Sequence, residues 1–212
     1  MKILHVCALG MTVKHLLKPQ MDYFLSRGDT VEAVCSPGVE VEALRQQGYT
    51  IHTVPIERRI LSAQNLKSLH QLSSLMRIEQ YDIVHVHTPI ASVLGRVAAK
   101  LSGIPHIIYT AHGFPFHDRS PWLEYWLYFL IEKGCAAFTD LILTQNLEDV
   151  ETATRRHLCH PDKVRYLGNG IDSDRFDPAA IAPATKAALR QSLGIPESAR
   201  AIVGTIGRLT YK

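Results

Sequence analysis

Short apolar runs alternate with longer amphipathic segments along most of the chain. The apolar runs are rich in β-branched residues and predict seven strands, over residues 2–8, 30–35, 50–54, 83–87, 106–110, 141–144 and 164–167. Apolar positions at helical spacing predict helices over residues 14–27, 65–79, 92–102 and 148–157. Almost continuously apolar strands separated by helices are typical of an α/β fold, in which helices cover both faces of a parallel sheet.

The alternation of strands and helices changes after residue 167. Residues 168–172 (GNGID) are typical of a turn, and the chain is then irregular up to a short predicted helix over residues 186–193. Residues 201–206 again have the pattern of a buried strand. We therefore expect a complete domain over residues 1–168, an interdomain linker over 169–200, and the first strand of a second, truncated domain over 201–212.

Composition and charge argue against three classes of protein: nucleic-acid-binding, disulfide-rich and membrane-spanning proteins. Of the 212 residues, 46% are apolar, and 23 basic less 20 acidic residues leave a net charge of +3. This small and scattered excess argues against a nucleic-acid partner. The four cysteines form no CxxC pair, so we expect reduced thiols rather than a disulfide framework. No apolar stretch approaches the roughly 20 residues that span a bilayer, so we expect no membrane crossing.

Candidate functional residues are sought directly after the predicted strands. Open parallel sheets bind their ligands beyond the carboxyl ends of the strands. Gly10 follows the first strand and fits either an anion-binding helix start or a tight turn. His85 and His87 share one face of a strand, and His112 or His117 would complete a metal site. No carboxylate at ligand spacing accompanies them, which leaves packed, structural histidines as the alternative. His112 itself could exchange a proton near neutral pH.

An aromatic segment covers residues 122–131 and places two tryptophans, two tyrosines and a phenylalanine on several faces of a predicted helix. Such a helix usually belongs to the core. Amphipathic aromatic side chains also suit the boundary of a membrane, which is the alternative for this segment.

Four motifs occur in a recognisable order. They are residues 82–89 (DIVHVHTP), 109–114 (YTAHGF), 168–172 (GNGID) with Arg175 and Phe176, and 204–209 (GTIGRL). With these separations the chain resembles the family 4-type retaining glycosyltransferases, and the resemblance covers essentially its whole length. Among them, it is most similar to bacterial enzymes that build capsule, exopolysaccharide or O-antigen sugars.

The resemblance implies the GT-B architecture, two Rossmann-like domains that face each other across a cleft, with this chain as the N-terminal, acceptor-binding domain. It implies transfer of a sugar from a nucleotide-diphosphate sugar to a lipid-linked or oligosaccharide acceptor, with retention of anomeric configuration and no metal or other cofactor. We expect this part of the enzyme to be inactive by itself. A polyprenyl-linked acceptor implies that the enzyme acts in the cytoplasm, bound peripherally to the inner membrane. By resemblance, the catalytic residue is His112, the acceptor-binding residues are Gly10, Met11, His15, His87 and Gly113, and the donor diphosphate is bound by Arg208 and Lys212.

The chain departs from the family pattern in its first loop, which has the single Gly10 where paired glycines are usual, and Lys212 alone could supply the lysine expected after the GTIGRL motif. Two other functions remain as alternatives. One is a flavodoxin-like binding or signalling module without catalysis, and the other is a metal-dependent hydrolase built on His85, His87 and His112.

Overall fold

A computed structural model of the chain describes residues 1–57, 59, 62–117, 120–196 and 198–204. Seven parallel strands form one sheet in the order β3-β2-β1-β4-β5-β6-β7. The strands are β1 (Lys2–Leu9), β2 (Thr30–Ser36), β3 (Thr50–Thr53), β4 (Ile83–His87), β5 (His106–Ala111), β6 (Leu141–Thr144) and β7 (Val164–Tyr166). The α/β class, the parallel sheet and all seven predicted strands are thus confirmed.

The helices fill the connections between the strands. They are α1 (Gly10–Thr12), the π-helical turn η1 (Val13–Leu17), α2 (Lys18–Ser26), α3 (Val39–Gln46), α4 (Ala63–Glu79), α5 (Pro89–Leu101), α6 (Trp122–Ala136) and α7 (Leu147–Arg155), with short 3₁₀ turns η2 (Pro161–Lys163) and η3 (Pro178–Ala180) and a last helix α8 (Pro183–Ser192). None of the described helices is long and apolar enough to cross a bilayer.

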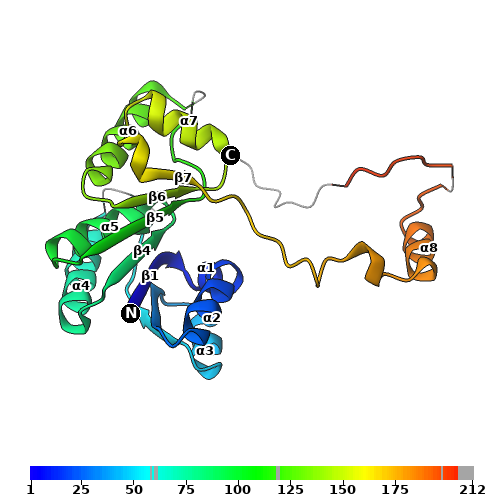
Figure 1. Ribbon diagram of the computed structural model, residues 1–212, viewed down its shortest axis with the longest axis horizontal. Coiled ribbons are helices and arrows are strands. Elements are labelled where there is room, and N and C mark those ends of the chain that lie inside the picture. The colour runs from blue at the N-terminus through cyan, green and yellow to red at the C-terminus, as the bar shows by residue number, and fades with distance from the viewer. Residues whose placement is uncertain (58, 60–61, 118–119, 197, 205–212) are drawn as a thin grey trace. The chain divides into compact units, whose positions relative to one another are not determined.

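The strand order contains one reversal, which lies between β1 and β4. From β1 the chain moves outward through β2 to β3, then crosses back along α4 and moves outward in the other direction from β4 to β7. Right-handed crossovers therefore put α1–α3 on one face of the sheet and α4–α5 on the other, as Figure 1 shows. Open α/β sheets bind ligands beyond the carboxyl ends of the strands at such a reversal.

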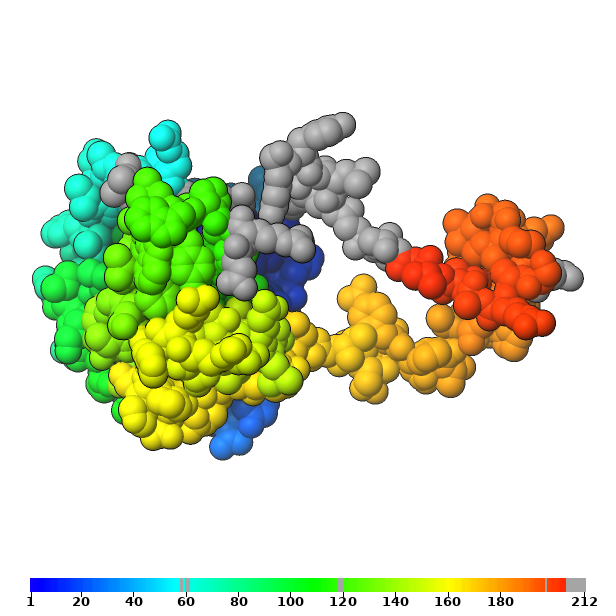
Figure 2. Space-filling model, turned by 90° about the horizontal axis from the view of Figure 1, so that it is seen from above, coloured from blue at the N-terminus to red at the C-terminus, as the bar shows by residue number. Residues whose placement is uncertain are grey.

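Each face of the sheet has its own core. Leu4 and Val6 of β1 point into the larger core, whereas Ile3 and Cys7 point into a smaller one with the buried side of α1–α3. Helix α5 approaches the larger core closely because Gly95 has no side chain: a Cβ there would lie 2.7 Å from a Val86 methyl carbon. Figure 2 shows the surface of the part of the chain that contains this sheet, residues 1–169, coloured from blue to yellow.

The start of the first helix differs from the sequence prediction. We expected a loop over residues 9–12 and a helix from Lys14, but the helical path begins at Gly10 and includes a π-helical turn at Val13–Leu17. A Cβ on Gly10 would lie 3.2 Å from the Cβ of Glu40, so the glycine allows close packing against α3. Helix α3 itself was not predicted, because its eight residues bury only Val41 and Leu44.

The chain divides into two compact units, Met1–Asn169 and Gly170–Lys212. The second unit contains η3 and α8, and both lie within the segment that we expected to be a linker. Residues 201–204 have no regular secondary structure, so the described part of the expected strand over residues 201–206 is not a strand. Arg208 and Lys212 lie outside the described residues, and their donor-binding roles stay predictions.

Candidate functional site

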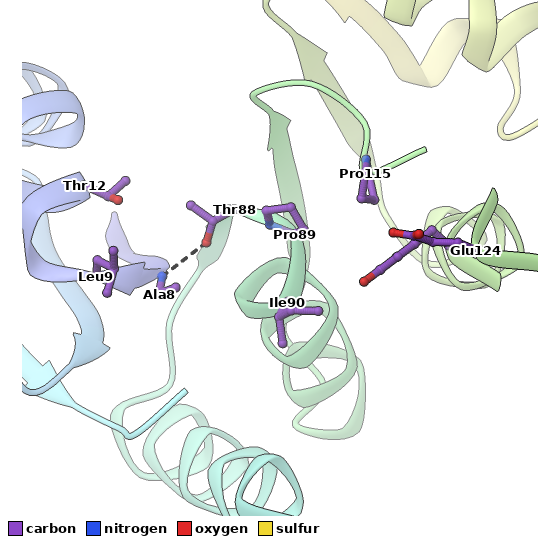
Figure 3. Close-up of a pocket in the computed structure, with 9 residues that line it drawn as sticks. Ala8, Leu9, Thr12, Thr88, Pro89, Ile90, Pro115 and Glu124 are labelled. Carbon is purple, nitrogen blue, oxygen red and sulfur yellow. Dashed lines mark hydrogen bonds between the residues drawn. The ribbon is translucent and has the colours of Figure 1, made fainter. Parts of the chain in front are cut away.

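A pocket of about 370 Å³ opens at the reversal of strand order. The carboxyl ends of β1 and β4 form one side of it, and the segment after β5 together with α6 forms the other (Figure 3). We call it the switch-point pocket; it is lined by Ala8, Leu9, Thr12, Thr88, Pro89, Ile90, Pro115, Glu124 and Tyr128. A largely apolar concavity with a few polar groups is the usual form of a small-molecule site.

Thr88 joins the two strands that border the reversal. Its Oγ1 accepts a hydrogen bond of 3.2 Å from the backbone N–H of Ala8 (Figure 3). Its backbone has φ 63° and ψ 145°, a region that side chains with a Cβ rarely adopt. Pro89 then starts α5 in the first helical position, where its missing N–H costs nothing. Backbone strain of this kind concentrates at functional sites, which supports the assignment of the pocket.

His112 and Gly113 follow β5 beside this pocket. His112 is half-buried, and its Nε2 is buried without a hydrogen-bond partner among the described residues. Gly113 has φ 111°, a conformation that only glycine adopts without strain, and this lets the chain turn sharply after the histidine. The half-exposed ring lies just beyond a strand end, where a histidine is a suitable group to contact a substrate, although its Nε2 atom is itself enclosed.

A row of stacked imidazoles runs from the interior of the sheet to His112. His5 and His85 are register partners on β1 and β4, and the His85 and His87 ring centroids lie 4.2 Å apart. The His87 ring stacks on His112 at 5.6 Å. His5 Nδ1 and His87 Nε2 are 3.2 Å apart, so one donates to the other. The row is therefore continuous from the buried core to the edge of the candidate site.

Burial keeps the interior part of this row neutral. His5 is 0% and His87 1% exposed. Desolvation lowers the pKa of His5 to about 4 and holds the pKa values of His85 and His87 well below their usual value. His5 Nε2 and His87 Nδ1 both lack a partner among the described residues. Whichever ring donates, one buried N–H is thus left unpaired.

The metal-dependent hydrolase alternative rested on His85, His87 and His112, but the described histidines that come close enough to share a metal are His5, His85 and His87. One ligand nitrogen from each of His5, His85 and His87 lies within 4.8 Å of the others, so a metal could be held there after small movements. His85 Nε2 is also 2.8 Å from the Thr110 hydroxyl. Catalytic metals need an open coordination position that substrate can reach, and these rings are fully enclosed. The arrangement therefore does not suit a hydrolytic metal centre.

The remaining predicted acceptor residues are dispersed. Gly10 is buried against α3, whereas Met11 and His15 lie exposed on α1 and η1. His87 is enclosed behind His112 and does not line the pocket. Gly113 lines a separate pocket, and His112 stands three residues before Pro115 of the switch-point lining. The acceptor-binding roles of these residues stay predictions.

None of the described residues that the sequence predicted for the site lines the switch-point pocket, and the missed lining residues include Thr88 and Glu124. Thr88 stands inside a motif that we singled out, and its position directly after a predicted strand could have identified it. Glu124 gave no signal, because it interrupts the apolar segment that became α6 and reaches the pocket only through tertiary packing.

The aromatic segment is only partly core. Phe129 is buried within the larger core, and Tyr125 and Tyr128 pack against it. One apolar surface of α6 remains exposed, and the exposed fraction of Trp122 is 75%. We call this surface the α6 face; it consists of Trp122, Leu123, Trp126, Leu127 and Leu130. The core assignment is thus correct for one side of the helix and wrong for the other.

Comparison with known proteins identifies the family. The model of the glycosyl transferase 4-like family matches residues 5–146, which run from within β1 past the end of β6 and include every lining residue of the switch-point pocket. The chain belongs to this family. The resemblance to the family 4-type glycosyltransferases is thus confirmed, and the motifs at residues 82–89 and 109–114 lie within the matched part of the chain.

Individual relatives carry the same assignment. The chain is 30% identical over 198 residues to EpsD of Bacillus subtilis, which is named as a glycosyltransferase, covering 92% of this chain and 50% of EpsD. It is 34% identical over 122 residues to the UDP-Gal:alpha-D-GlcNAc-diphosphoundecaprenol alpha-1,3-galactosyltransferase of Escherichia coli, covering 58% and 32% of the two chains. It is 28% identical over 183 residues to the capsular polysaccharide biosynthesis glycosyltransferase CapM of Staphylococcus aureus, covering 82% and 46%. The glycosyltransferase chain thus spans at most about half the length of these curated relatives.

A solved structure supports the fold. The glycosyltransferase chain superposes on Anabaena HepE, solved in complex with UDP and glucose, with a TM-score of 0.65 at 17% identity, covering 92% of this chain and 50% of HepE. The Rossmann-like α/β architecture of the GT-B glycosyltransferases is confirmed for this chain.

Proposed function

We propose that the chain is the acceptor-binding half of a retaining glycosyltransferase of cell-surface polysaccharide biosynthesis. Such an enzyme moves a sugar from a nucleotide-diphosphate sugar to a lipid-linked or oligosaccharide acceptor. The observation that carries the proposal is the switch-point pocket, which lies at the ligand-binding edge of a sheet belonging to the glycosyl transferase 4-like family. Family membership favours this function over the non-catalytic flavodoxin-like module.

The leaving nucleoside diphosphate gains negative charge as the glycosidic bond to the donor sugar breaks. A bidentate guanidinium stabilises such charge better than a point cation, and we propose that role for Arg208, with Lys212 as a second donor-binding residue. We place the rest of the donor site in the part of the relatives that this chain does not span. The chain alone should therefore lack transferase activity.

His112 is the group we propose to contact the transferred sugar. Its ring is half-exposed beyond the end of β5 and stacks on the buried ring of His87. In the complete enzyme, His112→Ala is expected to lower kcat at least tenfold, which corresponds to about 1.4 kcal/mol of transition-state stabilisation. Steady-state kinetics with saturating donor and acceptor measures the effect.

A matched control separates catalysis from folding. His70→Ala removes an exposed histidine from α4 and is expected to leave kcat and the melting temperature unchanged. A His112 variant that keeps its fold, seen by circular dichroism, and also keeps near-normal kcat would remove His112 from the reaction.

The α6 face is the surface we propose for contact with a lipid membrane. The E. coli relative of this chain is named for a substrate that is linked to diphosphoundecaprenol, a membrane lipid. Cationic side chains flank the aromatic helix: the Arg156 guanidinium lies 5.9 Å from the Tyr125 ring centre and the Lys133 ammonium 5.8 Å from that of Phe129. These two cations lie over rings on the core side of α6, so the exposed tryptophans of the α6 face are the main support for contact with a bilayer surface. The protein would then work at the cytoplasmic face of the inner membrane.

Co-sedimentation with vesicles tests this contact. We expect the chain to bind vesicles of phosphatidylglycerol more than those of phosphatidylcholine, and less in high salt because the Debye length shortens. Replacing Trp126 and Leu127 together with serine should reduce binding at least about fivefold. Leu66→Ser, which removes an exposed leucine from α4, is the control and should have no effect. Equal binding by all three proteins, or none under any condition, would reject a membrane role for α6.

A further inference from the structure

We propose that the switch-point pocket binds an uncharged sugar ring of the acceptor, and that Glu124 is the residue that selects it. The inference rests on the proposed function and says which chemical part of the acceptor enters the pocket: a hydroxyl-bearing ring, with the phosphate groups held outside.

The lining suits a sugar ring. Pro89, Ile90, Pro115 and Tyr128 give apolar walls on opposite sides of the pocket, and these match the C–H faces of a pyranose. Thr12 and Thr88 contribute hydroxyl groups at the ends of β1 and β4. The volume of about 370 Å³ lies within the range of small-molecule sites. The pocket thus combines apolar packing with a few hydrogen-bonding groups.

Glu124 supplies the one charged side chain among the described residues of this lining. Figure 3 shows its side chain extending from α6 toward Pro115 and the space that faces β4. A carboxylate only accepts hydrogen bonds, whereas each sugar hydroxyl can donate one, and such charge-assisted bonds are stronger than neutral ones. A phosphate offers no donor in its ionised form and is repelled by the carboxylate.

The cations near the site lie elsewhere. Arg155 and Arg156 line a separate pocket of about 700 Å³, together with the carboxylates of Glu148, Asp149 and Glu151. The switch-point pocket has no lysine or arginine in its described lining. Charge therefore sorts the two ends of a phosphorylated acceptor, with the sugar in the switch-point pocket and the anionic group outside it.

Glu124 also lies in the first turn of α6, where a negative charge stabilises any helix. Glu42 likewise lies in the first turn of α3 and is absent from the described lining of the switch-point pocket. Glu42→Gln therefore controls for the loss of a helix-terminal charge, and only a role in ligand selection separates the two variants.

Ligand-observed NMR on the chain tests binding directly. The probes are the methyl α-glycosides of glucose, galactose and N-acetylglucosamine, together with the 1-phosphates of the same sugars. We expect at least one neutral glycoside to bind about tenfold more tightly than its 1-phosphate. Glu124→Gln should weaken that glycoside about tenfold and remove the preference over the phosphate, while Glu42→Gln changes neither. Tighter binding of a 1-phosphate, unchanged binding in Glu124→Gln, or no binding of any neutral glycoside would overturn the proposal.

Kinetics of the complete enzyme distinguish this inference from the proposed function. Glu124→Gln should raise the acceptor KM about tenfold, leaving the donor KM and donor hydrolysis unchanged. Sugar transfer with an unaltered acceptor KM in Glu124→Gln would reject only the role of Glu124. Absence of transfer by the unmodified enzyme, with sugar binding by the chain intact, would reject the proposed function instead.

Discussion

Replacing Arg96 with methionine is expected to lower the free energy of unfolding by about 3–5 kcal/mol. Arg96 on α5 donates a 2.8 Å hydrogen bond to Glu132 on α6, and their side chains are 0% and 2% exposed. The guanidinium carbon also lies 4.2 Å from the Tyr109 ring centre. Burial raises the pKa of the Glu132 carboxyl, and the guanidinium opposes that shift. Without Arg96, an uncompensated acidic group would be enclosed between two helices.

The double variant Arg96→Met/Glu132→Leu provides the critical control. Replacing both members of a buried pair with apolar side chains removes the desolvation cost of both charges, so most of the lost stability should return. Urea denaturation of the wild type and both variants measures the difference. A double variant as unstable as Arg96→Met alone would show that packing, and not the unpaired carboxyl, dominates at this site.

Lowering the pH from 6.5 toward 4 is expected to destabilise the chain progressively. His5 has a folded pKa of about 4 because of burial, against about 6.5 in the unfolded chain. The unfolded state therefore binds more protons in this window, so stability is full above pH 6.5 and falls as the pH drops. The shift of His5 alone is worth about 3 kcal/mol at the acid end. His85 and His87, with pKa values lowered in the same direction, add to the loss.

Denaturation at several pH values checks this expectation. With three neutral buried histidines, the free energy of unfolding should change by up to about 4 kcal/mol per pH unit between pH 4.5 and 6. His5→Gln should reduce that slope by about one proton, and His70→Gln on exposed α4 controls for the loss of any histidine. Stability that stays level from pH 7 to pH 5 would contradict the neutral row.

Several features of the fold and of the site could be predicted from the local sequence. The β-branched runs gave each strand to within one residue, because a strand buried on both faces must be apolar throughout. The helix predicted over residues 148–157 starts within one residue of α7, where the Asn146 side chain caps the helix by accepting a 2.7 Å hydrogen bond from the Asp149 N–H. The motifs around His87 and His112 placed both histidines at the ends of strands, which is where the structure has them.

By itself, then, the sequence determined the parallel sheet, its seven strands and the family, since these depend on local periodicity and on motifs in order. Tertiary structure alone decided that β1 lies beside β4, which creates the switch-point pocket, because strand pairing over 80 residues leaves no local pattern. It also enclosed His87, exposed Trp122 and brought Glu124 to the pocket. Burial and proximity depend on which surfaces cover a side chain, and those surfaces come from distant parts of the chain.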